Sequence, residues 1–273
     1  MASFRNTSNH SQRLTEIKIP QDVSTELHLV GVRAKDASEI TLNIKGIPLR
    51  FSIRSTPHSG ANGVWLVELN GHMSGVAVLE SIFKGRTVAS IQVSCYKKIT
   101  VRLPDQATTQ GMLCRLFLAH ATQPSHLAGY NSDASRQSML WMRLALQNRL
   151  SHPDPTVFGA TAKEEGAPFN FFDIVRHRGQ FRSFENYPHI DAPTKRVIDS
   201  CLNIANNYAH PARDDYAAFV HNAIAAAADH ALDSVLDPTP SGLIAWREKG
   251  DTLPPESMVP FQELAGRIFY TQS

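Results

Sequence analysis

The hydrophobic period of the chain changes near residue 105, and this change constrains the fold more than any other feature. Before that point, short segments alternate apolar and polar residues or run through Val, Ile and Leu between Gly, Pro, Asn and Asp, which is typical of β-strands. Six strands are expected: Glu26–Arg33, Ile40–Ile44, Arg50–Ile53, Gly63–Leu69, Gly75–Leu79 and Val88–Tyr96. After Thr108, apolar residues recur at helical spacing.

The second half is expected to be mainly helical. Helices are predicted from Met112 to Ala121, Ser135 to Leu150, Thr194 to Ala209 and Asp215 to Leu232, with a loop-rich tract at Ser151–Pro193. We therefore expect an α+β protein of two domains. Residues 1–15 are predicted to be a mobile tail, 16–105 a small antiparallel β sandwich or barrel that acts as a docking or delivery module, and 106–273 a helical domain.

The two halves also differ in their balance of basic and acidic residues. Residues 1–104 hold 13 Lys and Arg against 7 Asp and Glu, and the remainder holds 14 against 18. The chain as a whole has a formal net charge of only +2, which does not favour nucleic-acid binding. A hydrophobic content of 42% excludes a wholly disordered chain.

The cysteines and the N-terminal residues indicate in which cellular compartment the protein is made. The three cysteines, Cys95, Cys114 and Cys201, form no CxxC pair, so neither a disulfide framework nor a thiolate zinc site is indicated. No signal peptide and no membrane span is recognised. We therefore expect synthesis in a reducing cytoplasm and, if the protein acts elsewhere, export without a cleaved signal.

Four separated motifs occur in the second half. A helix ends in Asn148-Arg149-Leu150, the loop-rich tract contains Gly179-Gln180-Phe181, Asp237-Pro238-Thr239 follows later, and the chain closes with Phe269-Tyr270. Their order and spacing resemble the cell-wall hydrolases related to the spore-cortex-lytic enzyme SleB, over about residues 108–271. This resemblance implies a lysozyme-like helical domain that cleaves the peptidoglycan glycan strand between N-acetylmuramic acid and N-acetylglucosamine, as a muramidase or lytic transglycosylase.

At the position where the resembling family has its catalytic glutamate, this sequence has a histidine. The family places a catalytic Glu in a Leu-Ala-Glu-Ala pattern, and the matching residues here are Leu118-Ala119-His120-Ala121. His120 itself is one candidate proton donor, although an imidazolium would oppose a developing oxocarbenium charge. A second interpretation moves the acid to Asp133 or Glu185. In the third, the domain has lost its acid, by divergence or by an engineered change, and keeps only glycan binding.

Several residues are candidates for substrate binding, and each also has a structural interpretation. Gln180 is suited to hydrogen-bond a sugar amide or to cap a loop. Phe181 and Tyr187 are suited to stack on sugars, but aromatic residues at this spacing are more often core. Asn148 is a candidate contact whose commoner role is to fasten the helix end. No metal site, cofactor or phosphate loop is expected.

The leading functional hypothesis is peptidoglycan glycan-strand cleavage by a secreted antibacterial effector, such as a type VI secretion toxin, or by a phage-type lysin, acting in the target-cell periplasm. The expected partners are peptidoglycan, a secretion-apparatus component held by the N-terminal module, and an immunity protein. The alternative is a catalytically inactive peptidoglycan-binding protein or secretion-apparatus adaptor built on a hydrolase fold.

Overall fold

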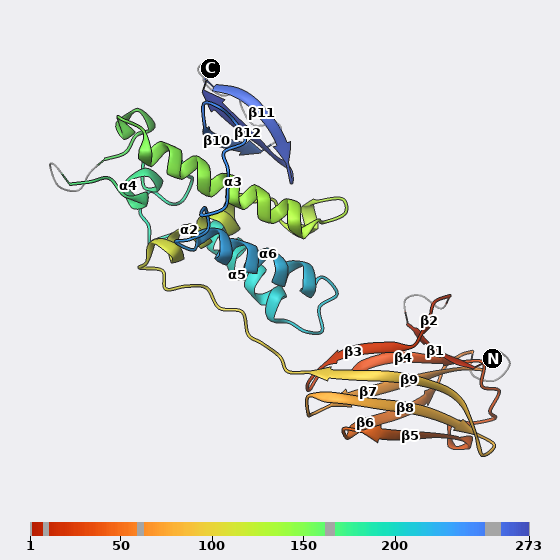
Figure 1. Cartoon of the computed structure of the whole chain (residues 1–273). Coiled ribbons are helices and arrows are strands. Elements are labelled where there is room, and N and C mark those ends of the chain that lie inside the picture. The colour runs from red at the N-terminus through yellow and green to blue at the C-terminus, as the bar shows by residue number, and fades with distance from the viewer. Residues whose placement is uncertain (1, 8–10, 59–62, 162–166, 249–257, 273) are drawn as a thin grey trace. The chain divides into compact units, whose positions relative to one another are not determined.

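The computed structural model describes residues 2–7, 11–58, 63–161, 167–248 and 258–272. The chain divides into two compact units, Met1–Ile99 and Thr100–Ser273, which run from red to yellow and from yellow to blue in Figure 1. Each unit has its own cluster of buried apolar side chains. Helix and strand each account for about 31% of the structure.

The N-terminal unit consists of two sheets that contribute to one apolar core. The five-stranded sheet has the order β2 (Arg13–Leu14), β1 (Ser3–Asn6), β4 (Thr25–Val30), β7 (Val64–Gly71) and β6 (Leu49–Ser55). The four-stranded sheet has the order β3 (Glu16–Pro20), β9 (Arg86–Tyr96), β8 (Gly75–Phe83) and β5 (Ile40–Gly46). A 3-10 turn, Ala37–Glu39, precedes β5.

Strand alternation explains how the core of this unit forms. Trp65, Val67 and Leu69 on β7 are almost fully buried, with Leu66 and Glu68 between them partly exposed, as expected for a sheet with one face on a core. The Trp65 indole nitrogen donates a 2.7 Å hydrogen bond to the Val32 carbonyl oxygen, which satisfies the one polar group of this large side chain.

The predicted small antiparallel sandwich or barrel is wrong in its topology. The described strands form two separate sheets and no closed barrel, and β3 pairs with β9 in parallel. The predicted tail at residues 1–15 also needs correction, because it contains β1, where Phe4 is fully buried, and β2. Alternation locates strands but leaves their pairing partners undetermined, which is why the sequence pattern missed this arrangement.

The C-terminal unit contains five α-helices among its described residues. They are α2 (Thr109–His120), α3 (Ser132–Ser151), α4 (Phe171–Val175), α5 (Ala192–Asn206) and α6 (Arg213–Ala227), with 3-10 turns at Pro124–His126 and Pro155–Phe158. Capping fixes where α3 and α5 begin: the side chains of Asn131 and Asp191 accept hydrogen bonds from the backbone N–H groups of Ala134 and Thr194. α6 packs against α2, α3 and α5.

A three-stranded antiparallel sheet completes this unit and corrects the prediction of a mainly helical domain. Its order is β10 (Leu243–Glu248), β12 (Arg267–Gln272) and β11 (Met258–Leu264). β10 packs on α3, and Figure 1 shows the sheet beside that helix. Leu243, Ile244 and Ala245 are consecutive buried residues, a pattern that does not separate strand from buried helix by periodicity alone.

Within the described ranges, no helix is both long and apolar enough to cross a bilayer. Cys95, Cys114 and Cys201 are buried free thiols, and burial raises the pKa values of Cys114 and Cys201 to about 12. These two thiols are therefore protonated at neutral pH and unsuited to nucleophilic attack.

Candidate functional site

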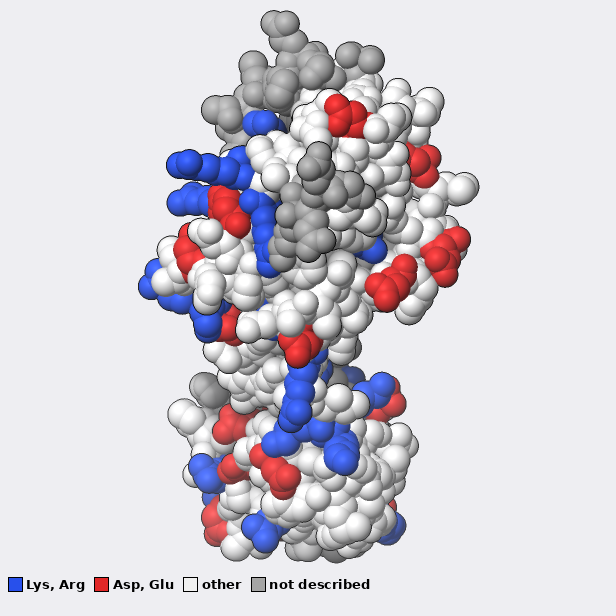
Figure 2. All heavy atoms as spheres, turned by 90° about the vertical axis from the view of Figure 1, so that its left-hand side faces the viewer, with Lys and Arg blue, Asp and Glu red and all other residues white. Residues whose placement is uncertain are grey.

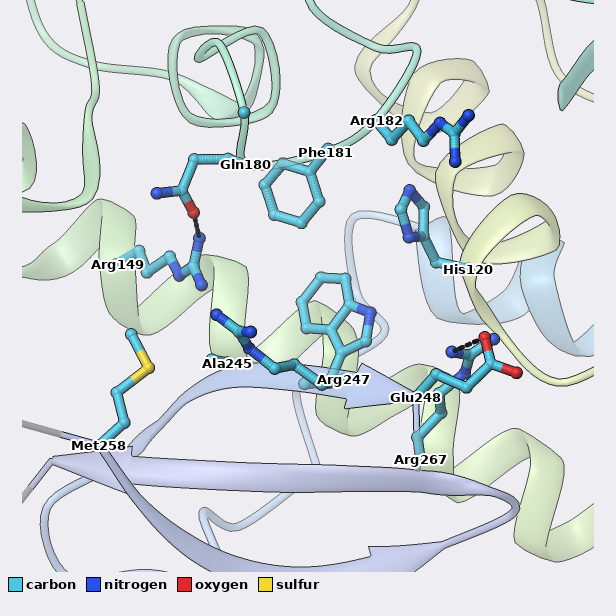
Figure 3. Close-up of a pocket in the computed structure, with 12 residues that line it drawn as sticks. His120, Arg149, Gln180, Phe181, Arg182, Ala245, Arg247, Glu248, Met258 and Arg267 are labelled. Atoms are coloured by element: carbon cyan, nitrogen blue, oxygen red, sulfur yellow. Dashed lines mark hydrogen bonds and ion pairs between the residues drawn. The ribbon is translucent and has the colours of Figure 1, made fainter. Parts of the chain in front are cut away.

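A cavity of about 370 Å³ lies between the C-terminal end of α2, the last turn of α3, the 179–182 loop and the β-sheet of the C-terminal unit. We call it the arginine cavity. It is lined by His120, Arg149, Gly179, Gln180, Phe181, Arg182, Ala245, Trp246, Arg247, Glu248, Met258 and Arg267. His120, Arg149 and the Gly179-Gln180-Phe181 motif, which are far apart in the sequence, therefore line one cavity (Figure 3).

His120 is the last residue of α2, and its imidazole packs against aromatic rings. Its ring centroid lies 5.9 Å from that of Phe181, in a T-shaped arrangement, and 6.0 Å from that of Phe184. Burial, followed by the positive charge of Arg267, lowers the pKa of His120 to about 4. The imidazole is therefore neutral at pH 7 and is not the cationic acid that one interpretation of the sequence required.

Arg149 connects the end of α3 to both the sheet and the loop. Its Nε donates a 2.5 Å hydrogen bond to the Ile244 carbonyl oxygen. Its Nη1 donates a 3.0 Å hydrogen bond to Oε1 of Gln180, which Figure 3 marks. Burial, reinforced by Arg247, lowers the pKa of Arg149 to about 10, so the group remains a cation at pH 7. Because the Gln180 oxygen is engaged, its amide NH₂ is the end that remains suited to a ligand.

Charge in the arginine cavity is strongly one-sided. Arg149, Arg182, Arg247 and Arg267 line it, whereas Glu248 is the only carboxylate among the described lining residues. Glu248 pairs with Arg267 across β10 and β12, with 3.2 Å between Oε2 and Nη1. Among the described lining residues, arginines therefore outnumber carboxylates, and the neutral His120 adds no charge at pH 7.

An aromatic pair lies within the lining. The rings of Phe181 and Trp246 have centroids 5.4 Å apart and planes inclined by 33°. Phe181 is only 4% exposed, so most of its ring is already covered by protein. Of the two, Trp246 is the more accessible and the better candidate to contact a sugar ring.

Asn148, predicted as a substrate contact, does not line the arginine cavity. Its Nδ2 donates hydrogen bonds of 2.7 Å to Oδ2 of Asp237 and 2.8 Å to the Leu243 carbonyl oxygen. Burial alone would raise the pKa of Asp237, but donation by the Thr239 backbone N–H and by Asn148 holds it below its usual value. The helix end is thus tied to the turn that starts β10.

The remaining predicted residues lie elsewhere. Tyr187 is 3% exposed, donates a 2.8 Å hydrogen bond to the Gln106 carbonyl oxygen and lines a different cavity. Glu185 lines a neighbouring hollow that shares only Arg182 with the arginine cavity. Asp133 lies in the first turn of α3, about 24 Å along the helix from Arg149 at 1.5 Å per residue. Neither carboxylate lines the arginine cavity.

Sequence reasoning missed Trp246, Arg247, Glu248 and Arg267, all on the sheet. The sequence signal for this hairpin is the turn-forming Gly266; in the structure Ala265 and Gly266 both have positive φ, 47° and 75°, as a two-residue hairpin turn requires. The flanking residues pair as β11 and β12, which would have placed Arg267 on a strand.

Among the described residues, no three His, Cys, Asp or Glu side chains gather as a metal site.

Comparison with known proteins adds little to this geometry. No family model matches the chain, and no curated protein matches it. Three solved structures of S-layer proteins, rSbsC, SbsC domains 4 and 5, and SbsC domains 1–6, align at 10%, 10% and 9% identity with TM-scores of 0.26, 0.24 and 0.28. They cover 33%, 30% and 38% of this chain, and the alignments span only 13%, 47% and 14% of those chains.

Proposed function

We propose that the C-terminal unit binds the glycan strand of bacterial peptidoglycan in the arginine cavity, as a relative of the SleB-like cell-wall hydrolases. The observation that carries this proposal is the convergence of motifs separated in sequence. His120, Arg149 and Gln180 line one cavity, and Asn148 beside them donates a hydrogen bond to Asp237 of the third motif. Such a meeting of the motif residues is what a shared site requires.

Electrostatics favour binding over cleavage. Glycosidic cleavage passes through an oxocarbenium-like transition state, which carboxylates stabilise and cations oppose. The lining holds four arginines, one ion-paired carboxylate and a neutral histidine at the position that corresponds to the family's acid. The binding-only alternative from the sequence therefore fits this site better than an active glycosidase does.

Cleavage remains the second candidate because of Glu248. Its carboxylate lies in the arginine cavity, where neither Asp133 nor Glu185 lies. If the chain cleaves glycan, Glu248 is the described side chain placed to exchange a proton with the leaving oxygen, and Arg267 is the residue that positions it.

A binding and product assay separates the candidates. Full-length protein is incubated with purified peptidoglycan, bound protein is measured by co-sedimentation, and released muropeptides are analysed by mass spectrometry. Binding without anhydro or reducing-end products is expected for the wild type. Absence of binding overturns the proposal.

Three variants sharpen the outcome. His120→Glu restores a carboxylate at the family's acid position, and product release from this variant alone would identify a glycan-binding scaffold that lacks only its acid. Product release by the wild type that Glu248→Gln abolishes would establish the cleavage candidate instead. His126→Gln, at an exposed histidine of the 3-10 turn at Pro124–His126, is the control expected to behave as the wild type.

A further inference from the structure

A second cavity, of about 300 Å³, lies at the start of α2. We call it the Phe172 cavity, and it is lined by Gln106, Ala107, Asn170, Phe172, Arg176, Tyr187 and Pro188. Gln106 and Ala107 lie just before α2, whereas His120 of the arginine cavity is the last residue of that helix. The 12 residues of α2 span about 18 Å, and no described residue lines both cavities. The two cavities are therefore separate.

One wall of the Phe172 cavity is made of rings. The centroids of Phe172 and Tyr187 lie 6.2 Å apart, with their planes inclined by 44°, and Pro188 adds a third ring. The Tyr187 hydroxyl is already engaged, because it donates a hydrogen bond to the Gln106 carbonyl oxygen. This wall therefore offers apolar surface of the kind on which the C–H face of a sugar packs.

The polar groups beside these rings are hydrogen-bond donors. Oδ1 of Asn170 accepts a 2.9 Å hydrogen bond from the Phe172 backbone N–H, so its NH₂ group is the end suited to a ligand. Nε of Arg176 is buried and has no acceptor among the described residues. A buried donor without an acceptor costs about 1–3 kcal/mol, so a ligand that supplies an acceptor here would be stabilised.

The charges around the cavity favour a neutral ligand over an anion. Arg176 is the only charged side chain in its described lining, and its guanidinium lies over the Phe172 ring, 4.8 Å from the centroid. The buried Asp173 lines an adjoining hollow together with Phe172 and Arg176, so a bound anion would face a carboxylate. In Figure 2, which faces the side of the C-terminal unit where α4 lies in Figure 1, charged side chains gather toward the two edges and much of the surface between them is uncharged.

We propose that the Phe172 cavity is a second glycan-binding site that takes one N-acetylated sugar. The acetamido oxygen accepts from Nε of Arg176, and the apolar face of the sugar lies on Phe172 and Pro188. This inference rests on the proposed function for its class of ligand, because both sugars of the peptidoglycan strand are N-acetylated. The volume of about 300 Å³ lies at the lower end of ligand pockets, ~300–1,000 Å³, which suits a single sugar unit.

An NMR titration of the full-length protein tests the proposal at the donor itself. The Nε–H signal of Arg176, assigned by its loss in Arg176→Lys, is followed as N-acetylglucosamine or glucose is added. N-acetylglucosamine is expected to shift this signal to saturation. Glucose lacks the acetamido group, and its affinity is expected to be at least about tenfold lower because the Nε donor then lacks its acceptor.

Acetate, used as a third probe, separates a sugar site from an anion site. An affinity for acetate equal to or above that for N-acetylglucosamine overturns the assignment to a sugar, and so does equal affinity for glucose. No shift with any probe overturns the second site, and the proposed function still stands if the same protein co-sediments with peptidoglycan. Absence of both the shift and co-sedimentation overturns the proposed function as well.

Matched arginine variants locate the effect. The backbone N–H signal of Ala107, which lines the cavity, reports binding in every variant, and circular dichroism checks that each is folded. Arg176→Gln and Arg176→Lys both remove the Nε donor, and each is expected to weaken binding of N-acetylglucosamine at least about tenfold. Arg178→Gln, at an exposed arginine that lines neither cavity, is expected to bind as the wild type does. Unchanged affinity in both Arg176 variants, or an equal loss in Arg178→Gln, would contradict the proposal.

Discussion

At the scale of single residues, His120 makes stability depend on pH. Its pKa of about 4 in the folded chain lies below the value of about 6.5 that an exposed histidine has. Between these values the unfolded chain binds more protons than the folded chain, so acidification from pH 7 favours unfolding.

The expected contribution from His120 is a loss of about 2 kcal/mol between pH 7 and pH 5. Urea unfolding of wild-type and His120→Gln protein at both pH values measures it, since the variant lacks the titrating group. His126→Gln, at an exposed histidine, is expected to keep the wild-type dependence on pH. Parallel pH profiles for the wild type and His120→Gln would contradict the prediction.

Asn148 is a second residue whose replacement is expected to lower the stability of the folded chain. Asn148→Ala is expected to lower the free energy of unfolding by about 2 kcal/mol, because the half-buried Asp237 carboxylate and the Leu243 carbonyl each lose a donor. The neighbouring variant Gln147→Ala removes only a bond to Ser151 on the same helix, and about 0.5 kcal/mol or less is expected. Equal shifts of the two urea midpoints would refute the role assigned to Asn148.

The sequence predicted which residues lie near the cavity better than it predicted what each of them does. His120, Gln180 and Phe181 were chosen from the motifs, and all three line the arginine cavity. Asn148 and Tyr187 are instead engaged with Asp237 and with the Gln106 carbonyl. A motif shows that residues are needed near one another, but it does not distinguish a ligand contact from the hydrogen bonds that support it.

At the scale of elements, the turn before β10 determines how the sheet meets α3. Gly242 has φ of +84° there, and a Cβ at this position would lie 3.0 Å from Nδ2 of Asn148. A side chain at Gly242 would therefore meet both an unfavourable backbone conformation and the amide that ties the turn to the helix.

Gly242→Ala is expected to destabilise the chain by about 1 kcal/mol more than Gly129→Ala. Gly129 has a similar φ of +76°, but a Cβ at that position would have nothing within 4 Å of it, so the comparison isolates the contact with Asn148. Thermal or urea unfolding of both variants measures the difference. Equal destabilisation would mean that backbone strain alone accounts for the cost of replacing Gly242 by alanine.

The helices were easier to predict than the C-terminal strands for a physical reason. α3 and α5 have capping residues and a recurring apolar spacing, which are local signals. β11 exposes most of its residues, and β10 begins with three consecutive buried ones, so neither strand alternates. Their identity depends on pairing with β12, which is a contact between distant segments.

At the scale of the whole molecule, the two units have separate apolar cores. The N-terminal cluster lies within residues 2–95, and the C-terminal cluster begins at Val101. Val101 is held by the side chain of Asn206, which accepts a 2.8 Å bond from its backbone N–H and donates a 3.0 Å bond to its carbonyl oxygen. The C-terminal unit therefore begins structurally at this residue.

Residues 1–99 expressed alone are expected to fold, because their core is complete within the fragment. Circular dichroism should show β structure with little helix, and urea should produce one cooperative transition. Leu79→Asp is the matched control, since it buries a charge at a fully buried position and should abolish the transition. A wild-type fragment without a cooperative transition would show that this unit depends on the rest of the chain.

The parallel pairing of β3 with β9 has a mechanical consequence. The two strands align over five residue pairs, from Glu16 opposite Gln92 to Pro20 opposite Tyr96. Tension applied before Glu16 and after Tyr96 pulls these strands past each other along their length, so the hydrogen bonds between them are stretched together and not one at a time. Separating β3 from β9 by tension at these two points therefore requires a larger force than opening the same hydrogen bonds one after another would require.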